Sequence, residues 1–299
     1  MAKNKNAIKE GSKAFDIVVY VLAGILCLIT VYPMYYVIIL SISDPIHVAA
    51  GNIFLVPKGF SLNSYQMIFA DVAMWRAYAN TIFYVVATTL LMLITCVLAA
   101  YPLTSKSLIA RKFITIFILI PMYFGGGLIP TYLLMTKIGL YNNSLAIILP
   151  AAVSVWNIIL TRTYFNSIPE TVRESASIDG ASHFTILFRI YIPLAKPILA
   201  VVAIYTIVST WNSWFNAMIY LPNPDLQPLQ LYLRRVLIEN TVDLTKLPMN
   251  EVEAAVQKQL SNMQLKYAMI VFTTLPVLIT YPFFQKHFVK GIMVGSLKG

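Results

Sequence analysis

The chain has 299 residues, of which 59% are hydrophobic and only 11% are charged. Soluble domains carry roughly 45–50% apolar and about 25% charged residues. Together with the mean hydropathy of +0.73, this composition excludes a soluble globular protein and indicates an integral membrane protein. The formal net charge of +10 does not indicate a nucleic-acid partner, because the basic residues are spread over loop ends and do not form one stripe with interleaved aromatic residues.

Six apolar runs are each long enough to cross a bilayer as a helix, which takes ~20 residues. The runs cover residues 17–41, 77–103, 113–136, 142–161, 198–221 and 267–285. They are too long and too continuous for barrel strands, which have about ten residues of alternating polarity. The first run is also too long for a cleaved signal peptide, and we keep it as a span. We therefore predict an all-α integral membrane protein in which residues 1–299 form a single transmembrane domain of six helices.

None of the six runs contains Asp, Glu, Lys, Arg or His. A transporter driven by an ion gradient generally keeps such groups within the membrane, and a membrane enzyme needs titratable groups near its pocket. Both classes are therefore disfavoured, the enzyme more strongly. A gradient-driven transporter stays open as an alternative, because backbone carbonyls and hydroxyls can hold Na⁺.

The distribution of basic residues predicts the orientation of the chain. Most of the 22 Lys and Arg residues lie in the N-terminus, in the second-to-third and fourth-to-fifth connections, and in the C-terminal tail. By the positive-inside rule, both termini are cytoplasmic, the loop 162–196 is cytoplasmic and the loop 222–266 is external. Within the external loop, residues 250–264 have apolar side chains at helical spacing, which predicts a surface helix.

The cytoplasmic loop carries helix signals of its own. Residues 167–170, Ser-Ile-Pro-Glu, form a capping box that predicts a helix start at Ser167, and Gly180 is a natural stop. We expect a second helix after Ser182, broken by Pro193, and a fifth span opened by Pro197. One face of the first helix carries small side chains and allows close approach of another surface; it consists of Val172, Ser175, Ala176 and Asp179.

This loop resembles the EAA loop of the permease subunits of binding-protein-dependent ABC importers. The resemblance is carried by Glu174-Ser175-Ala176-x-x-Asp179-Gly180-Ala181, followed after eight residues by Ile190-x-Ile192-Pro193. Ser175 replaces the first Ala of the family pattern and Ile192 replaces its Leu, and both changes are mild. Further similar segments are Asn80-Thr81, residues 123–132, residues 139–143 and Trp211-Asn212, and residues 288–299 resemble the branch that imports oligosaccharides and polysaccharide fragments.

The resemblance implies a type I importer in the bacterial cytoplasmic (inner) membrane. In such systems two homologous permease subunits form the pathway, an ABC ATPase dimer lies beneath them, and an extracytoplasmic solute-binding protein delivers the carbohydrate substrate. This chain would then have no catalytic site, and since it contains no nucleotide-binding motif, ATP and Mg²⁺ would be bound by the partner ATPase. A permease of the same family for a non-sugar solute is the nearest alternative. The residues implied in ATPase coupling are Glu174, Ser175, Ala176, Asp179, Gly180 and Ala181.

The fifth span carries the best candidate for a pathway lining. Its polar residues fall at i, i+3, i+4 and i+7 of a helix, with Trp211 and Trp214 beside them; they are Ser209, Asn212, Ser213 and Asn216. Amides and hydroxyls can exchange hydrogen bonds with sugar hydroxyls, and indoles can stack on sugar rings. Such groups equally well bind one membrane helix to another, here to the second permease. Residues 125–127, Gly-Gly-Gly, are interpreted as a closely packed or unwound segment and not as a phosphate cradle.

Overall fold

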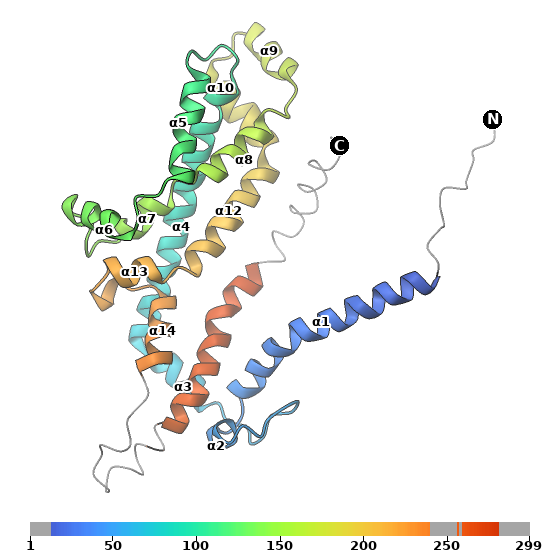
Figure 1. The fold of residues 1–299 in the computed structure, drawn as a ribbon, viewed down its shortest axis with the longest axis vertical. Helices are drawn as coiled ribbons and strands as arrows, with labels where there is room; N and C mark the ends of the chain where they lie inside the picture. Colours follow the sequence, from blue (N-terminus) through green and yellow to red (C-terminus); the bar gives the residue numbers. More distant parts are fainter. Residues whose placement is uncertain (1–12, 240–255, 257–258, 281–299) are drawn as a thin grey trace. The chain divides into compact units, whose positions relative to one another are not determined.

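The computed structural model describes residues 13–239, 256 and 259–280, and the regular elements of this part are helices (Figure 1). The chain divides into two compact units. The first comprises Met1–Ile68 and Asn240–Phe272, and the second comprises Phe69–Glu239 and Thr273–Gly299.

The first unit contains three helices from the N-terminal part of the chain and the beginning of the last helix. They are α1 (Lys13–Ser41), α2 (Pro45–Ala49), the greater part of α3 (Asn63–Ala70), and residues up to Phe272 of the helix Gln259–Thr280. Its core is small: Ile39, Leu40 and Ile53 are buried together. Most of α1 is exposed apolar surface, which in a bilayer faces lipid or another membrane helix.

A buried polar residue joins the parts of the first unit. The side chain of Gln264 is fully buried, and its Nε2 donates to the backbone carbonyls of Ser41 and Ser61 at 3.3 and 2.9 Å. Its Oε1 accepts a hydrogen bond from Ser64 Oγ at 3.0 Å. One amide therefore satisfies three groups on segments far apart in the sequence, where each buried polar group needs a partner.

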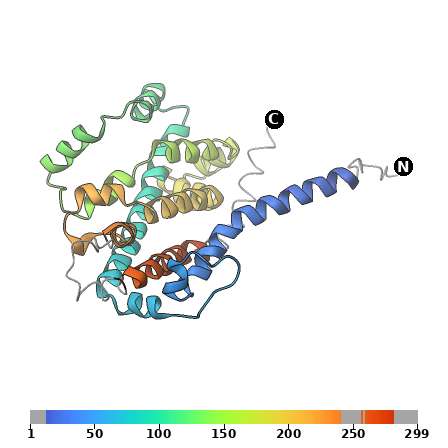
Figure 2. The same ribbon diagram turned by 60° about the horizontal axis from the view of Figure 1, so that its bottom comes forward.

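The second unit is built around α4 (Val72–Ala100), whose most extensive contact is with α12 (Lys196–Trp211). Figures 1 and 2 show α12 and α8 alongside α4. The other elements are η1 (Pro102–Thr104), α5 (Arg111–Tyr123), α6 (Leu128–Lys137), α7 (Leu145–Ala151), α8 (Val155–Phe165), α9 (Glu170–Ile178), α10 (His183–Ile186), η2 (Leu187–Tyr191), α11 (Ile192–Leu194), α13 (Phe215–Tyr220), η3 (Pro224–Leu226) and α14 (Leu229–Glu239). Where α4, α8 and α12 meet, Met92 and Cys96 pack against Ile158 and Val202.

The structure allows three to six membrane crossings, a range that includes the six predicted spans. Among the described residues, three uninterrupted helices are long and apolar enough to cross a membrane: Phe15–Ser41, Val72–Thr104 and Gln259–Thr280. Three bent helix pairs bring the number to as many as six if each pair forms one crossing. The second span begins five residues before the predicted start, because Asp71 caps α4 by accepting hydrogen bonds from Ala73 N and Met74 N at 2.8 and 3.3 Å.

The third predicted span, 113–136, is not one continuous helix. α5 and α6 meet at an angle of 111°. The break falls at Phe124, which is extended, and at the three glycines that follow it, of which Gly127 has a φ of +82°. Glycine has low helix propensity, and a positive φ is costly for any residue with a Cβ. The unwound alternative for residues 125–127 is thus confirmed.

The fifth predicted span, 198–221, is also interrupted. α12 ends at Trp211, residues 212–214 are not helical, and α13 begins at Phe215. Pro197 lies in the first turn of α12, as predicted, and the chain bends by 76° just before it. Pro193 does not break the preceding helix: a π turn at Leu187–Tyr191 precedes it, and the helix ends only at Leu194.

The separate surface helix predicted at 250–264 is not found in the described residues. Positions 250–255 and 257–258 lie outside them, and residues 259–264 form the first turns of the last helix. The prediction of an external loop extending to residue 266 therefore needs correction. Of the residues with this apolar periodicity, Leu260 and Met263 belong to the helix Gln259–Thr280, in which Gln264 is buried.

The first prediction concerns the amide that joins the first unit. Replacing Gln264 with Leu should lower the free energy of unfolding by about 1–3 kcal/mol, because two buried carbonyls and a hydroxyl lose their partner. The exposed Gln66 on α3 provides the matched control, and Gln66→Leu should change the melting temperature little. Thermal unfolding of the purified protein in detergent measures both; equal melting temperatures for the two variants would contradict a role of Gln264 in stability.

Candidate coupling and pathway sites

The C-terminus of α9 explains several residues of the EAA-like segment. Gly180, at φ +78°, donates its N–H to Ser177 O at 3.1 Å, and Ala181 donates to Ala176 O at 2.9 Å. These two bonds form a Schellman motif, in which the residue after the C-cap is left-handed and the next one reaches back to the third residue from the end. Asp179 is the C-cap residue.

The two alanines of this motif attach α9 to the rest of the second unit. Ala176 and Ala181 are half-buried and pack against a core cluster of residues from α4, α8 and the segment 186–195. The members of this cluster are Val97, Ala100, Phe165, Ile186, Leu187, Tyr191 and Ala195. The helix end and its hydrophobic contact therefore depend on small side chains at 176 and 181 and on glycine at 180.

The N-terminal turn of α9 is held by charges. Glu170 pairs with Lys106, from the connection between α4 and α5, and with Arg173 one turn along at 3.1 Å. The hydrogen bond and the charge of Lys106 lower the pKa of the Glu170 carboxyl, and Arg173 adds to this effect. The carboxylate is therefore ionised at neutral pH, and these pairs weaken only as the pH falls through that lowered pKa.

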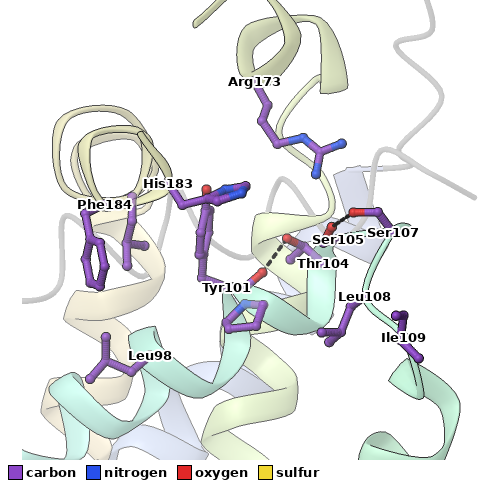
Figure 3. A pocket seen from close by; sticks show the side chains of 12 residues that line it. Leu98, Tyr101, Thr104, Ser105, Ser107, Leu108, Ile109, Arg173, His183 and Phe184 are labelled. Atoms are coloured by element: carbon purple, nitrogen blue, oxygen red, sulfur yellow. Dashed lines mark hydrogen bonds between the residues drawn. The ribbon is translucent and has the colours of Figure 1, made fainter. Parts of the chain in front are cut away.

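A cavity of about 580 Å³ lies beside α9. Figure 3 shows Arg173 reaching from α9 over the cavity towards Thr104 and Ser105, with His183 and Phe184 on the opposite wall. The remaining lining residues come from the end of α4, from the segment between α4 and α5, and from the start of η2; they are Leu98, Tyr101, Pro102, Ser107, Leu108, Ile109 and Leu187. α9 is thus fixed at its two ends, by the ion pairs and by the Schellman motif, with a hollow at its side.

The exposed residues of α9 differ from the predicted docking face. Val172 and Ala176 are half-buried, so the face of small residues turns partly towards the chain itself, whereas Glu174, Ser175 and Asp179 are exposed. Sequence reasoning missed Ile178, whose side chain is 87% exposed at the end of this helix. The signal was present, because Ile178 is an apolar residue out of phase with the inward-facing positions.

The predicted capping box at Ser167 is wrong. Ser167 Oγ donates to Tyr164 O at 2.7 Å, within the last turn of α8, and the N-cap of α9 is Pro169. α8 runs to Phe165, further than the predicted fourth span, and this leaves Ser167 in its terminal turn. The predicted second helix after Ser182 is confirmed: α10 begins at His183, and Ser182 Oγ caps it by accepting a hydrogen bond from Thr185 N at 3.2 Å.

The predicted polar stripe of the fifth span is broken by the gap between α12 and α13. Trp211 is only 5% exposed; its Nε1 donates to Thr273 O at 3.1 Å and its ring meets Tyr78 edge to face at 5.6 Å. The predicted pathway contact of Trp211 therefore needs correction, because within this chain the indole is a buried packing element. Asn212 donates to Val208 O at 2.9 Å at the end of α12.

The remaining predicted pathway residues stay accessible. Ser209, Asn212 and Asn216 are exposed, and Ser213 is half-buried. Because residues 212–214 are not helical, these side chains gather around the end of α12 and the start of α13 and do not form one helical stripe. Trp214, which flanks them, is covered by the guanidinium of Arg234.

Two residues at the start of the second span, Asn80 and Thr81, hold the segment that leads into α14. Asn80 Nδ2 donates to the carbonyls of Asp225 and Gln227 at 2.7 and 3.2 Å, and Thr81 Oγ1 accepts from Leu229 N at 2.7 Å. Further along α4, Tyr84 donates to Leu226 O at 2.7 Å. One face of α4 thereby fixes the position of α14.

The comparisons with known proteins identify the family of the chain. Residues 92–294 match the family described as binding-protein-dependent transport system inner membrane component. The chain belongs to this family. It is 35% identical to protein LplC of Bacillus subtilis over 97% of both chains, and 33% identical to the polygalacturonan/rhamnogalacturonan transport system permease protein YtcP of the same organism over 96% of this chain and 99% of that one.

A solved structure is similar over the same length. It is a bacterial ABC transporter involved in the import of the acidic polysaccharide alginate, with a TM-score of 0.85, 36% sequence identity, and coverage of 95% of this chain and 100% of that one. The chain is therefore a multi-pass inner-membrane permease subunit of a binding-protein-dependent ABC importer, and not an enzyme. The family resemblance inferred from the EAA-like segment is confirmed.

The second prediction concerns Gly180. A Cβ at this position would meet nothing within 4 Å, so the cost of substitution comes from its left-handed backbone. Gly180→Val should strain the end of α9 by about 1–2 kcal/mol and shift the Ala176–Ala181 contact. Gly180→Asn is the matched control, because asparagine tolerates this conformation. Limited proteolysis of the loop should be faster in the valine variant alone; equal rates in both variants would contradict the argument.

Proposed function

We propose that this permease forms half of the translocation pathway of an ATP-driven importer for oligosaccharides or polysaccharide fragments. Two relatives support a saccharide substrate: one is named for polygalacturonan and rhamnogalacturonan transport, and the other belongs to an importer of alginate. The second half of the pathway would be a homologous permease. A solute-binding protein delivers the saccharide from outside, and membrane lipid surrounds the exposed apolar helices.

We infer that α9 couples this permease to the ATPase dimer, which binds ATP and Mg²⁺. The observation that carries this inference is the division of α9 into two faces. One face is fixed to the second unit by Ala176 and the ion pairs of Glu170, and the other presents Glu174, Ile178 and Asp179. An exposed isoleucine flanked by carboxylates suits an apolar pocket with a basic rim on the partner.

The orientation follows from the same proposal. With both termini cytoplasmic, α9 and the cavity beside it are cytoplasmic, and α14 is external. Within the second unit these elements lie at opposite ends (Figure 1). The external end with α14 would then bind the saccharide, while the cytoplasmic end with α9 follows the conformational change of the ATPase.

The third prediction tests the docking face. Ile178→Asp should reduce co-purification of the ATPase about tenfold or more, because a buried apolar anchor would become a desolvated charge. The permease itself should remain folded, since Ile178 makes little contact with its own chain. Val56→Asp is the control: Val56 is 68% exposed and lies in the first unit, away from α9 in the sequence. Full retention of the ATPase by the Ile178 variant would refute this docking face.

The fourth prediction tests the energy source. Because the six apolar runs contain no Asp, Glu, Lys, Arg or His, uptake of saccharide into proteoliposomes should require ATP and persist when proton and sodium gradients are collapsed. The measurement compares uptake with ATP, with a non-hydrolysable analogue, and with ATP plus a protonophore and a sodium ionophore. Uptake that stops with the ionophores at constant ATP would favour the gradient-driven alternative.

A further inference from the structure

The gap between α12 and α13 carries an aromatic and cationic pair at the predicted external end. The guanidinium carbon of Arg234, on α14, lies 4.4 Å from the ring centre of Trp214. Trp214 also meets Phe215 edge to face at 5.6 Å, and Asn216 is exposed next to it. The stacking is favourable, because the ring face carries negative potential.

Stacking leaves the edge of the guanidinium available. A guanidinium that rests on a ring by its face still has its N–H donors directed outwards in its plane. Within the part of the chain that the structure describes, Nη1 of Arg234 contacts Met218 Sδ, and a thioether is a weak acceptor. Among the described residues, no carboxylate lies within ion-pair distance of Arg234.

The surroundings of Arg234 are positively charged. It lines a cavity of about 320 Å³ together with Arg235, and no lining residue is acidic. Two carboxylates that contact the segment around α14 are engaged elsewhere: Asp225 pairs with Arg76, and Asp71 caps α4 and accepts a hydrogen bond from Tyr232. The other lining residues are Met218, Leu221, Pro222, Gln227, Leu231 and Ile238.

The position of Arg234 does not depend on a flexible loop. α14 is fixed to α4 by Asn80, Thr81 and the hydrogen bond from Tyr232 to Asp71. Burial and the adjacent Asp71 carboxylate raise the pKa of the Tyr232 hydroxyl, so it stays protonated and donates throughout the neutral range. The guanidinium is therefore held in place by its own helix α14 and by the contact with Trp214, which lowers the entropy lost when a ligand binds.

We propose that Arg234, stacked on Trp214, binds the carboxylate of a uronic-acid residue as an acidic saccharide passes the external end of this permease. A carboxylate fits the two parallel N–H donors at the guanidinium edge. The exposed Met218 offers apolar surface to the C–H face of the sugar ring, and the amide of Asn216 can bind its hydroxyls. This inference rests on the proposed function, and it narrows the substrate class from saccharides to polyuronates.

The relatives carry chemistry of the same kind. The two relatives are named for galacturonan and alginate, which are polymers of sugar acids whose carboxyl groups are ionised at neutral pH. A neutral sugar would leave the guanidinium edge without a charged partner. Arg234 would therefore discriminate by charge, through a strong contact that the neutral competitor cannot make.

The test measures binding to the permease–ATPase complex in nanodiscs, without the binding protein. Equilibrium dialysis compares radiolabelled tetragalacturonate with its uncharged methyl ester. Arg234→Gln should weaken tetragalacturonate binding by about tenfold or more, the usual scale for losing a hydrogen bond to a charged group, and should leave the ester unaffected. Arg234→Lys should retain part of the preference, because it keeps the charge without the fork. Lys137→Gln removes one exposed positive charge from the last turn of α6 and should change neither affinity.

The possible results separate the inference from the proposed function. Undetectable binding of tetragalacturonate to the wild type, or equal affinity of wild type and Arg234→Gln, overturns the role of Arg234. An equal loss of ester and acid binding overturns it too, because the residue would then be structural. Uptake assayed with the binding protein tests the proposed function independently. If the Arg234 variants import saccharide as fast as the wild type, the importer function stands and only the Arg234 site is refuted.

Discussion

Both sites of the second unit depend on the packing of α4. At its N-terminal end, Asp71 and Asn80 hold α14 and the turn before it. At its C-terminal end, Val97 and Ala100 belong to the cluster that carries the two alanines of the coupling segment. Between these ends α4 runs uninterrupted along α12. Because a packed helix resists bending, a displacement of the coupling segment and a displacement of α14 are tied to the same rigid element.

Hydropathy predicted the helices but not where they break; the unwound segment at 125–127 was indicated only by its three glycines. Long apolar runs identify membrane segments because each crossing needs a minimum length of apolar helix. The same measure is blind to the glycines at 125–127, which remain apolar while they unwind the chain, and to the gap at 212–214. At that gap Asn212 bonds back to Val208, a local choice that no hydropathy window registers. The polar stripe drawn across it was wrong for that reason.

The coupling segment was found from its sequence motif, but the roles of most of its residues could be assigned only from the structure. The sequence predicted Gly180 as the end of the helix, which the structure confirms, but it gave Ala176 and Ala181 the same coupling role as Glu174, whereas the hydrogen bonds show that both belong to the helix end. The exposed Ile178 lies between motif positions and was overlooked. A helical projection anchored on the inward-facing alanine would have indicated it, because an apolar residue on the outward face of a polar helix is unusual unless another surface covers it.

The placement of charge bears on how an acidic saccharide could pass. None of the six apolar runs holds a fixed cation, so a polyanion would meet no strong binding group within them. In the proposed role of Arg234, the charge of the saccharide is recognised at the external end, before the saccharide enters the pathway. Conduction needs binding that is strong enough to admit the substrate and weak enough to release it. One guanidinium at the external end, followed by neutral amides, satisfies both conditions. Each uronate forms a single ionic contact there, and the solvation that its carboxylate regains on leaving the guanidinium compensates for the loss of that contact.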